Sequence, residues 1–169
     1  MLVLTRTVIA ASLAAAGIAA TPAAATATPA TAASAASSAS SASSVTAAPY
    51  TPERVCGPGF RRVKDGHRAM RTREGAVFGD VYLMYSKRSG KNCVAAIKTA
   101  YLGTKTTTGA SIVVRGGGRS EDAQKYQFFA ETGHIDGSWK CVKYWGWTRD
   151  PSGRVEASGG RNSWGNCAG

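Results

Sequence analysis

The sequence contains little of what enzyme active sites and metal sites are built from. Its 169 residues include only two histidines, His67 and His134, far apart in the chain, and no Cys-x-x-Cys pair. Neither Gly-x-Ser-x-Gly nor His-Glu-x-x-His occurs, the motifs that position a nucleophilic serine or a catalytic zinc. The adjacent acids Glu121 and Asp122 would diverge on a strand, whereas a glycosidase needs two carboxylates that face one bond. We therefore expect no catalytic residue, no metal and no cofactor, although acids distant in sequence could still assemble a catalytic pair.

The first third of the chain lacks charge, because Arg6 is the only charged residue among the first 52. An apolar run over residues 8–20 and a cluster of small residues follow Arg6, which is the pattern of a secretory signal peptide. The run is shorter than the roughly 20 residues of a membrane-spanning helix. We expect a signal peptide over residues 1–25, secretion, and no transmembrane segment after processing. Residues 26–48 are almost entirely Ala, Ser and Thr, which predicts a disordered linker or a cleaved propeptide.

The remaining 121 residues, 49–169, are predicted to form one folded domain that carries all four cysteines. An even number of cysteines in an exported chain indicates two disulfides. Three pairings are open, and we favour the sequential, non-crossing one. It joins Cys56 to Cys93 and Cys141 to Cys167.

Hydrophobic alternation predicts an all-β domain. Two β-prone runs within residues 77–101 flank a polar segment that contains Gly90, which is typical of a hairpin. In the second run Cys93 shares a face with Ala95 and Ile97, so the cysteine should point with the apolar side chains. Seven or eight short strands at this spacing predict a small antiparallel β-sandwich or barrel with two disulfides, preceded by a disordered tether.

Four segments of the domain have specific expectations. The charged segment 65–75 is predicted to be an exposed loop, and the threonine-rich segment 105–109 a turn. Residues 121–124 could form a helical turn. Residues 139–147 are predicted to form a strong strand.

The domain is strongly basic, with a formal charge of +10 after residue 48. Such charge either keeps a secreted domain soluble or attracts polyanions, and for an exported protein these include wall polymers and anionic glycans; no nucleic-acid partner is expected in vivo. Exposed aromatic side chains of the tryptophan-rich strand could stack on sugar rings. We expect Trp139 and Trp145 to pack in the disulfide core and Trp147 to be exposed. The candidate surface-binding residues are Arg61, Arg62, Lys64, Lys140, Lys143 and Trp147.

Five short motifs span the predicted domain. They are Tyr50 with Cys56-Gly57-x-Gly59-Phe60, Gly79-x-Val81-Tyr82-Leu83-x-Tyr85, Gly90-Lys91-Asn92-Cys93-Val94, Cys141-Val142 ahead of Trp145-Gly146, and Gly165-Asn166-Cys167-Ala168. Together they resemble the spore-associated protein A family of filamentous actinobacteria over most of residues 50–169. The resemblance implies a small secreted protein of the aerial mycelium and spore envelope with no established enzymatic activity.

These observations lead to one functional hypothesis and two alternatives. The first is a non-enzymatic secreted protein of the cell wall or spore surface, binding a polyanion or glycan through basic and aromatic residues. A secreted cationic antimicrobial or toxin-like domain is the second. An enzyme acting on wall polysaccharide is the third.

Overall fold

The computed structural model describes residues 50–167. The predicted signal peptide, residues 1–25, and linker, residues 26–48, lie outside the described residues. The elements are α1 (Pro52–Cys56), β1 (Arg61–Arg71), β2 (Val77–Ser86), β3 (Lys91–Lys98), β4 (Thr106–Val114), β5 (Gly118–Tyr126), β6 (Phe129–Glu131), β7 (Ile135–Asp136), β8 (Val142–Arg149) and β9 (Glu156–Gly165). The described part of the chain contains no helix long and apolar enough to cross a membrane.

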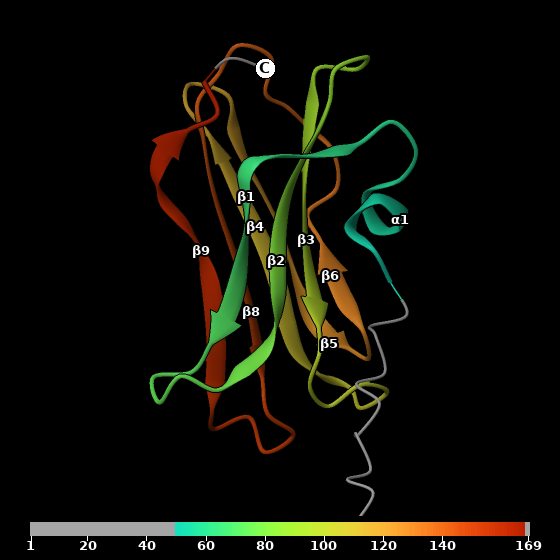
Figure 1. Ribbon diagram of the computed structural model, residues 1–169, viewed down its shortest axis with the longest axis vertical. Helices are drawn as coiled ribbons and strands as arrows, with labels where there is room; N and C mark the ends of the chain where they lie inside the picture. Colours follow the sequence, from blue (N-terminus) through green and yellow to red (C-terminus); the bar gives the residue numbers. More distant parts are fainter. Residues whose placement is uncertain (1–49, 168–169) are drawn as a thin grey trace, which may run out of the picture. The chain divides into compact units, whose positions relative to one another are not determined.

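The nine strands form one antiparallel sheet in the order β5-β4-β8-β9-β1-β2-β3-β6, with β7 also paired to β3 (Figure 1). The two ends of this order, β5 and β6, are consecutive in the chain and meet at a seam. There Ser120 Oγ of β5 donates a hydrogen bond to the carbonyl oxygen of Thr132, just after β6. The sheet is therefore nearly closed and barrel-like. The all-β prediction is confirmed, with a barrel-like sheet and nine strands in place of seven or eight.

Strand alternation divides the apolar side chains between two clusters. The larger one contains Val81, Leu83 and Tyr144 from facing parts of the sheet. The smaller one lies on the other face of β2 and β3 and contains Cys93, with α1 contributing Cys56. Because β3 is buried on both faces, its sequence reads as a nearly continuous apolar run.

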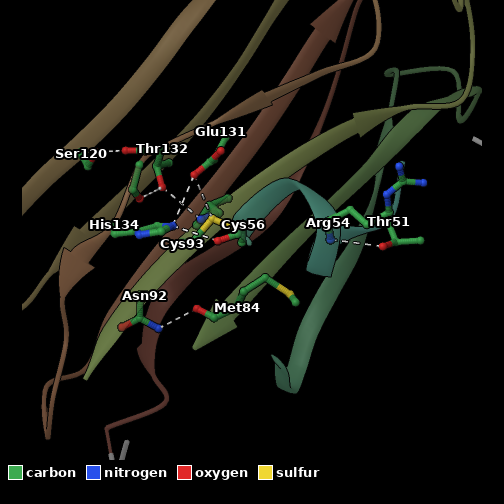
Figure 2. The surroundings of a disulfide bond; sticks show 12 residues. Thr51, Arg54, Cys56, Met84, Asn92, Cys93, Ser120, Glu131, Thr132 and His134 are labelled. Carbon is green, nitrogen blue, oxygen red and sulfur yellow. Dashed lines mark hydrogen bonds and ion pairs between the residues drawn. A yellow bond between two sulfur atoms is a disulfide. The ribbon is translucent and has the colours of Figure 1, made fainter. Parts of the chain in front are cut away.

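Both predicted disulfides are confirmed. Cys56–Cys93 ties α1 to β3, and Cys141–Cys167 ties the residue before β8 to the segment after β9. The short helix was not predicted from the sequence. It begins after Thr51, whose Oγ1 accepts a hydrogen bond from the Arg54 amide at 3.3 Å, as Figure 2 shows.

Three of the segment predictions are wrong, because strands replace the expected loop and turns. Residues 65–71 continue β1, so only 72–75 of the predicted loop connect two strands; residues 106–109 belong to β4, and residues 121–124 belong to β5. Polar side chains in such strands are satisfied by neighbours across the outer face of the sheet. His67 is one example, since its Nε2 lies 2.7 Å from Asp80 Oδ1 and its ring stacks on Tyr82.

The predicted strand at 139–147 is shorter at its start, because β8 begins at Val142. Trp139 lies in the preceding turn with a φ of 56° and is 81% exposed. It does not pack against the disulfide, contrary to the expectation. The expectations for the other two tryptophans are also wrong: Trp145 is 39% exposed, and Trp147 is half-buried over Gly109, where an added Cβ would collide with the indole ring.

Candidate functional site: a basic pocket at one end of the barrel

A wide bulge in β1 shapes one end of the barrel. Arg62 pairs with Met84 and His67 with Tyr82, so residues 63–66 lie opposite a single residue of β2. Bulges of this kind bend a strand and turn its side chains in new directions. The bulge therefore takes the start of β1, with its run of basic residues, out of the regular pleat.

The core holds this bulge in place. Asp65 has a φ of 58°, in the left-handed region that aspartate tolerates better than most residues. Its carbonyl oxygen accepts a hydrogen bond from the hydroxyl of buried Tyr144 at 3.1 Å. The next residue must be glycine, because a Cβ at Gly66 would lie 2.7 Å from the Leu83 carbonyl oxygen. Burial raises the pKa of Tyr144, so the phenol stays protonated and remains a donor.

A pocket of about 510 Å³ opens beside the bulge, between the start of β1 and the β2–β3 hairpin. Its lining contains five cationic side chains and no aspartate or glutamate, and none of the five makes an ion pair within residues 50–167. The five are Arg61, Arg62, Lys64, Lys87 and Arg88. Their charges are solvent-exposed, and like charges gathered around one concave surface produce a positive potential that attracts anions.

Trp139 borders the hairpin side of this pocket. It lines an adjoining hollow of about 440 Å³ together with Lys87 and Arg88. Its turn is fixed to the hairpin, because the Gly137 amide and the Ser138 hydroxyl both donate hydrogen bonds to the Gly90 carbonyl oxygen, at 3.0 and 3.2 Å. An exposed indole thus stands next to two cations, held by a backbone conformation that is rare for a bulky residue.

The predicted surface-binding residues fall into separate places. Arg61, Arg62 and Lys64 line the basic pocket together. Lys140 instead pairs with Asp136 at 2.9 Å, and this hydrogen bond is the main reason that the pKa of Asp136 is lowered. Lys143 and Trp147 lie on β8, outside the pocket lining.

Sequence reasoning missed three members of the site: Lys87, Arg88 and Trp139. The first two were visible as a basic turn between two strands, which is the usual composition of an exposed hairpin loop. Only the pairing of Arg61 with Tyr85 brings that turn beside the start of β1.

A second cluster of polar side chains surrounds the Cys56–Cys93 disulfide (Figure 2). His134 Nε2 lies 2.9 Å from the Cys56 carbonyl oxygen and 3.7 Å from Glu131 Oε1. Glu131 and His134 lie close enough to Cys93 to form a three-ligand metal set. The sulfur of Cys93 is committed to the disulfide, however, and a metal requires the thiolate. The His134 imidazole instead lies between the Cys56 carbonyl at the end of α1 and the Glu131 carboxylate of β6.

The seam between β5 and β6 contains a pocket of about 360 Å³ with two carboxylates, Asp122 and Glu131. The Tyr126 hydroxyl donates a hydrogen bond to Asp122 Oδ1 at 2.7 Å. Burial, followed by this hydrogen bond, raises the pKa of Tyr126 from 10.0 to about 12. Burial also raises the pKa of Glu131.

The raised pKa of Tyr126 predicts an alkaline loss of stability. Below pH 10 both the folded and the unfolded chain keep the proton of the Tyr126 hydroxyl. The contribution of Tyr126 to the free energy of unfolding is then fully present. Between pH 10 and about 12 the unfolded chain releases the proton first, and the contribution is lost. Chemical denaturation across this range should show a smaller alkaline decline for Tyr126→Phe than for the unsubstituted protein. Equal declines would contradict the assignment.

Comparison with protein-family models, with curated proteins and with solved structures finds no match for this chain. The resemblance to the spore-associated protein A family therefore stays a prediction based on short motifs. What the molecule can do chemically has to be argued from its own surfaces, and the basic pocket is the most developed of them.

Proposed function

We propose that this is an exported, non-enzymatic envelope protein that holds a polyanionic wall polymer in the basic pocket. The observation that carries the proposal is the gathering of five cations around about 510 Å³ without a carboxylate in the lining. The predicted signal peptide supports a location at the cell surface. The two disulfides suit an oxidising compartment.

A phosphate-bearing polymer such as a teichoic acid fits this pocket best. Three of the five cations are arginines, whose planar guanidinium groups bind phosphate oxygens in pairs. The cations come from two chain segments on either side of the opening, so successive anionic groups can be held at once. Individual exposed contacts contribute only about 0.2–1 kcal/mol, so affinity would come from several acting together.

The test is a salt titration of binding to isolated cell walls, with and without teichoic acid, using a triple variant of the pocket. Arg62→Gln, Lys64→Gln and Arg88→Gln together remove three charges, and we expect binding to weaken by about tenfold or more if each contributes about 0.5–1 kcal/mol. The unsubstituted protein should lose binding steeply with added salt, because exposed charges are screened.

A matched control removes three charges at the other end of the barrel. Arg73→Gln, Lys105→Gln and Lys125→Gln change the net charge equally, at the β1–β2 turn, the β3–β4 turn and the end of β5. This control should keep nearly all binding. Equal losses in both triple variants would mean that overall charge, and not the pocket, binds the wall, and binding that survives stripping of teichoic acid would contradict the phosphate polymer.

The alternatives give different results in the same preparation. A cationic antimicrobial domain would stop the growth of neighbouring bacteria at micromolar protein. A wall-polysaccharide enzyme would change the glycan profile of the walls during incubation. We expect neither effect.

A further inference from the structure

The outer face of β4, β8 and β9 carries a second surface with a different character. Trp145, Trp164 and Val113 are 39%, 37% and 36% exposed. Ser111 pairs with Trp145, and Val113 pairs with Lys143, across the β4–β8 ladder, so these four side chains share one face. We call this surface, with Trp164, the tryptophan face.

A bulge in β9 completes this face. Gly165 pairs with Val142 and Arg161 with Tyr144, so residues 162–164 lie opposite Lys143 alone. This irregularity brings Trp164 against Lys143, whose Nζ lies 4.7 Å from the centre of the indole ring. Arg115 lies over the same ring at 5.1 Å. Two cation–π contacts thus hold Trp164 in one orientation.

The tryptophan face contains a hollow of about 290 Å³. Its apolar lining includes Trp145 and Val113, and its polar lining includes Ser111, Lys143, Arg161 and Asn162. Among the residues that the structure describes, no aspartate or glutamate contributes to the lining. The hollow therefore combines an aromatic surface, neutral hydrogen-bonding groups and the positive charge of Lys143.

The positive charge of Lys143 at the hollow is not neutralised by an ion pair within residues 50–167. Neither Lys143 nor Arg161 takes part in any ion pair there. Arg161 is fixed by a hydrogen bond from Nη2 to the Val142 carbonyl oxygen at 3.4 Å and by the Tyr144 ring, 5.5 Å away. Its Nε is the one buried side-chain polar atom of the described residues without a partner. Because Arg161 pairs with Tyr144, whose ring lies in the core, the guanidinium lies on the inner side of the sheet, and Lys143 is the cation that faces the hollow.

We infer that the tryptophan face binds a carboxylate-bearing sugar ring of an acidic polysaccharide. The apolar side of a pyranose stacks on Trp145, its hydroxyl groups meet Ser111 and Asn162, and its carboxylate faces Lys143. Phosphate alone would leave the aromatic surface unused, and a neutral sugar would leave the charge of Lys143 unmatched. This site shares no lining residue with the basic pocket, so the inference does not depend on the proposed function.

The probe is an oligogalacturonate, compared with its methyl ester, in which each carboxylate is neutral. Binding to the purified, disulfide-bonded protein is measured by calorimetry and by the change in tryptophan fluorescence. We expect Trp145→Ala to weaken binding by about tenfold, since it removes the stacking surface. Lys143→Gln should weaken it by about threefold to tenfold, and the methyl ester should bind more weakly by a similar factor.

Trp139→Ala is the matched control, because it deletes an exposed indole outside the tryptophan face. It should leave oligogalacturonate affinity unchanged, as should the triple variant of the basic pocket. The inference is overturned if the unsubstituted protein does not bind, if Lys143→Gln and Trp145→Ala both bind normally, or if the ester binds equally well. Loss of binding in Trp139→Ala or in the basic-pocket variant would also overturn it, since the acidic sugar would then occupy the basic pocket.

Discussion

Removal of the Cys56–Cys93 disulfide is expected to lower the free energy of unfolding by about 4 kcal/mol. The bond closes a separation of 37 residues, and the entropy that such a loop removes from the unfolded chain corresponds to about 4 kcal/mol. Both cysteines are buried in the smaller apolar cluster, so the double variant Cys56→Ala, Cys93→Ala avoids leaving a polar group there. Denaturant unfolding should show the loss as a lower midpoint. It would be a large share of a stability of about 5–15 kcal/mol.

The second disulfide is the natural control for this measurement. Cys141–Cys167 spans 26 residues, for which the same relation gives about 3.5 kcal/mol. If the loss at Cys56–Cys93 exceeds the loss at Cys141–Cys167 by more than these values predict, the excess measures what the docking of α1 on β3 adds, because this bond joins the two elements. A loss below about 1 kcal/mol for either double variant would contradict the loop-entropy argument.

Replacement of Tyr144 by alanine is expected to cost about 3–5 kcal/mol, the usual range for truncating a large buried aromatic residue. Tyr144 is buried in the main core and its hydroxyl reaches the Asp65 carbonyl oxygen of the β1 bulge. The substitution therefore removes core packing and the contact that fixes the bulge. Thermal or denaturant unfolding measures the total.

Tyr144→Phe separates these two contributions. It keeps the ring but removes this hydrogen bond from the Asp65 carbonyl, which retains its contact with Arg68 Nη1 at 3.3 Å, at a cost of about 0.5–1.5 kcal/mol. Because the bulge positions Arg61, Arg62 and Lys64, wall binding should weaken as well. Tyr126→Phe is the control, since its hydroxyl binds Asp122 and not the bulge. If Tyr144→Phe unfolded normally and bound walls normally, the bulge would not depend on this contact.

The parts of the fold that the sequence predicted are those set by local pattern. Alternation identified the hairpin around Gly90 and placed Cys93 on an apolar face. The cysteine order then suggested both disulfides. The hairpin depends on neighbours within one short segment, which single-sequence patterns report well. The disulfides span 37 and 26 residues, and they followed from the number and order of the cysteines.

The parts that escaped prediction depend on pairing between distant segments. Residues 65–71 look like a loop because they are charged, and pairing with β2 and, at Arg71, with β9 makes them a strand. Lys98 reads as a surface lysine, yet it is fully buried and its Nζ donates to the Thr104 and Tyr126 carbonyl oxygens. Burial accordingly lowers the pKa of Lys98. The tryptophan face was not predicted for the same reason, since Trp164 comes beside β8 through the β9 bulge.

The position of β1 in the sheet has a consequence for how the molecule is made. β1 lies between β2, which follows it directly, and β9, the last strand of the chain. The sheet cannot close until the C-terminal segment is available, so a chain emerging from a ribosome or an export channel must wait with unpaired edges on β1 and β8. Because the paired segments lie so far apart in the sequence, we expect this domain to fold more slowly than domains in which most contacts are local. This delay suits the export that we propose, because a sheet that needs its last strand stays open enough to be threaded across a membrane.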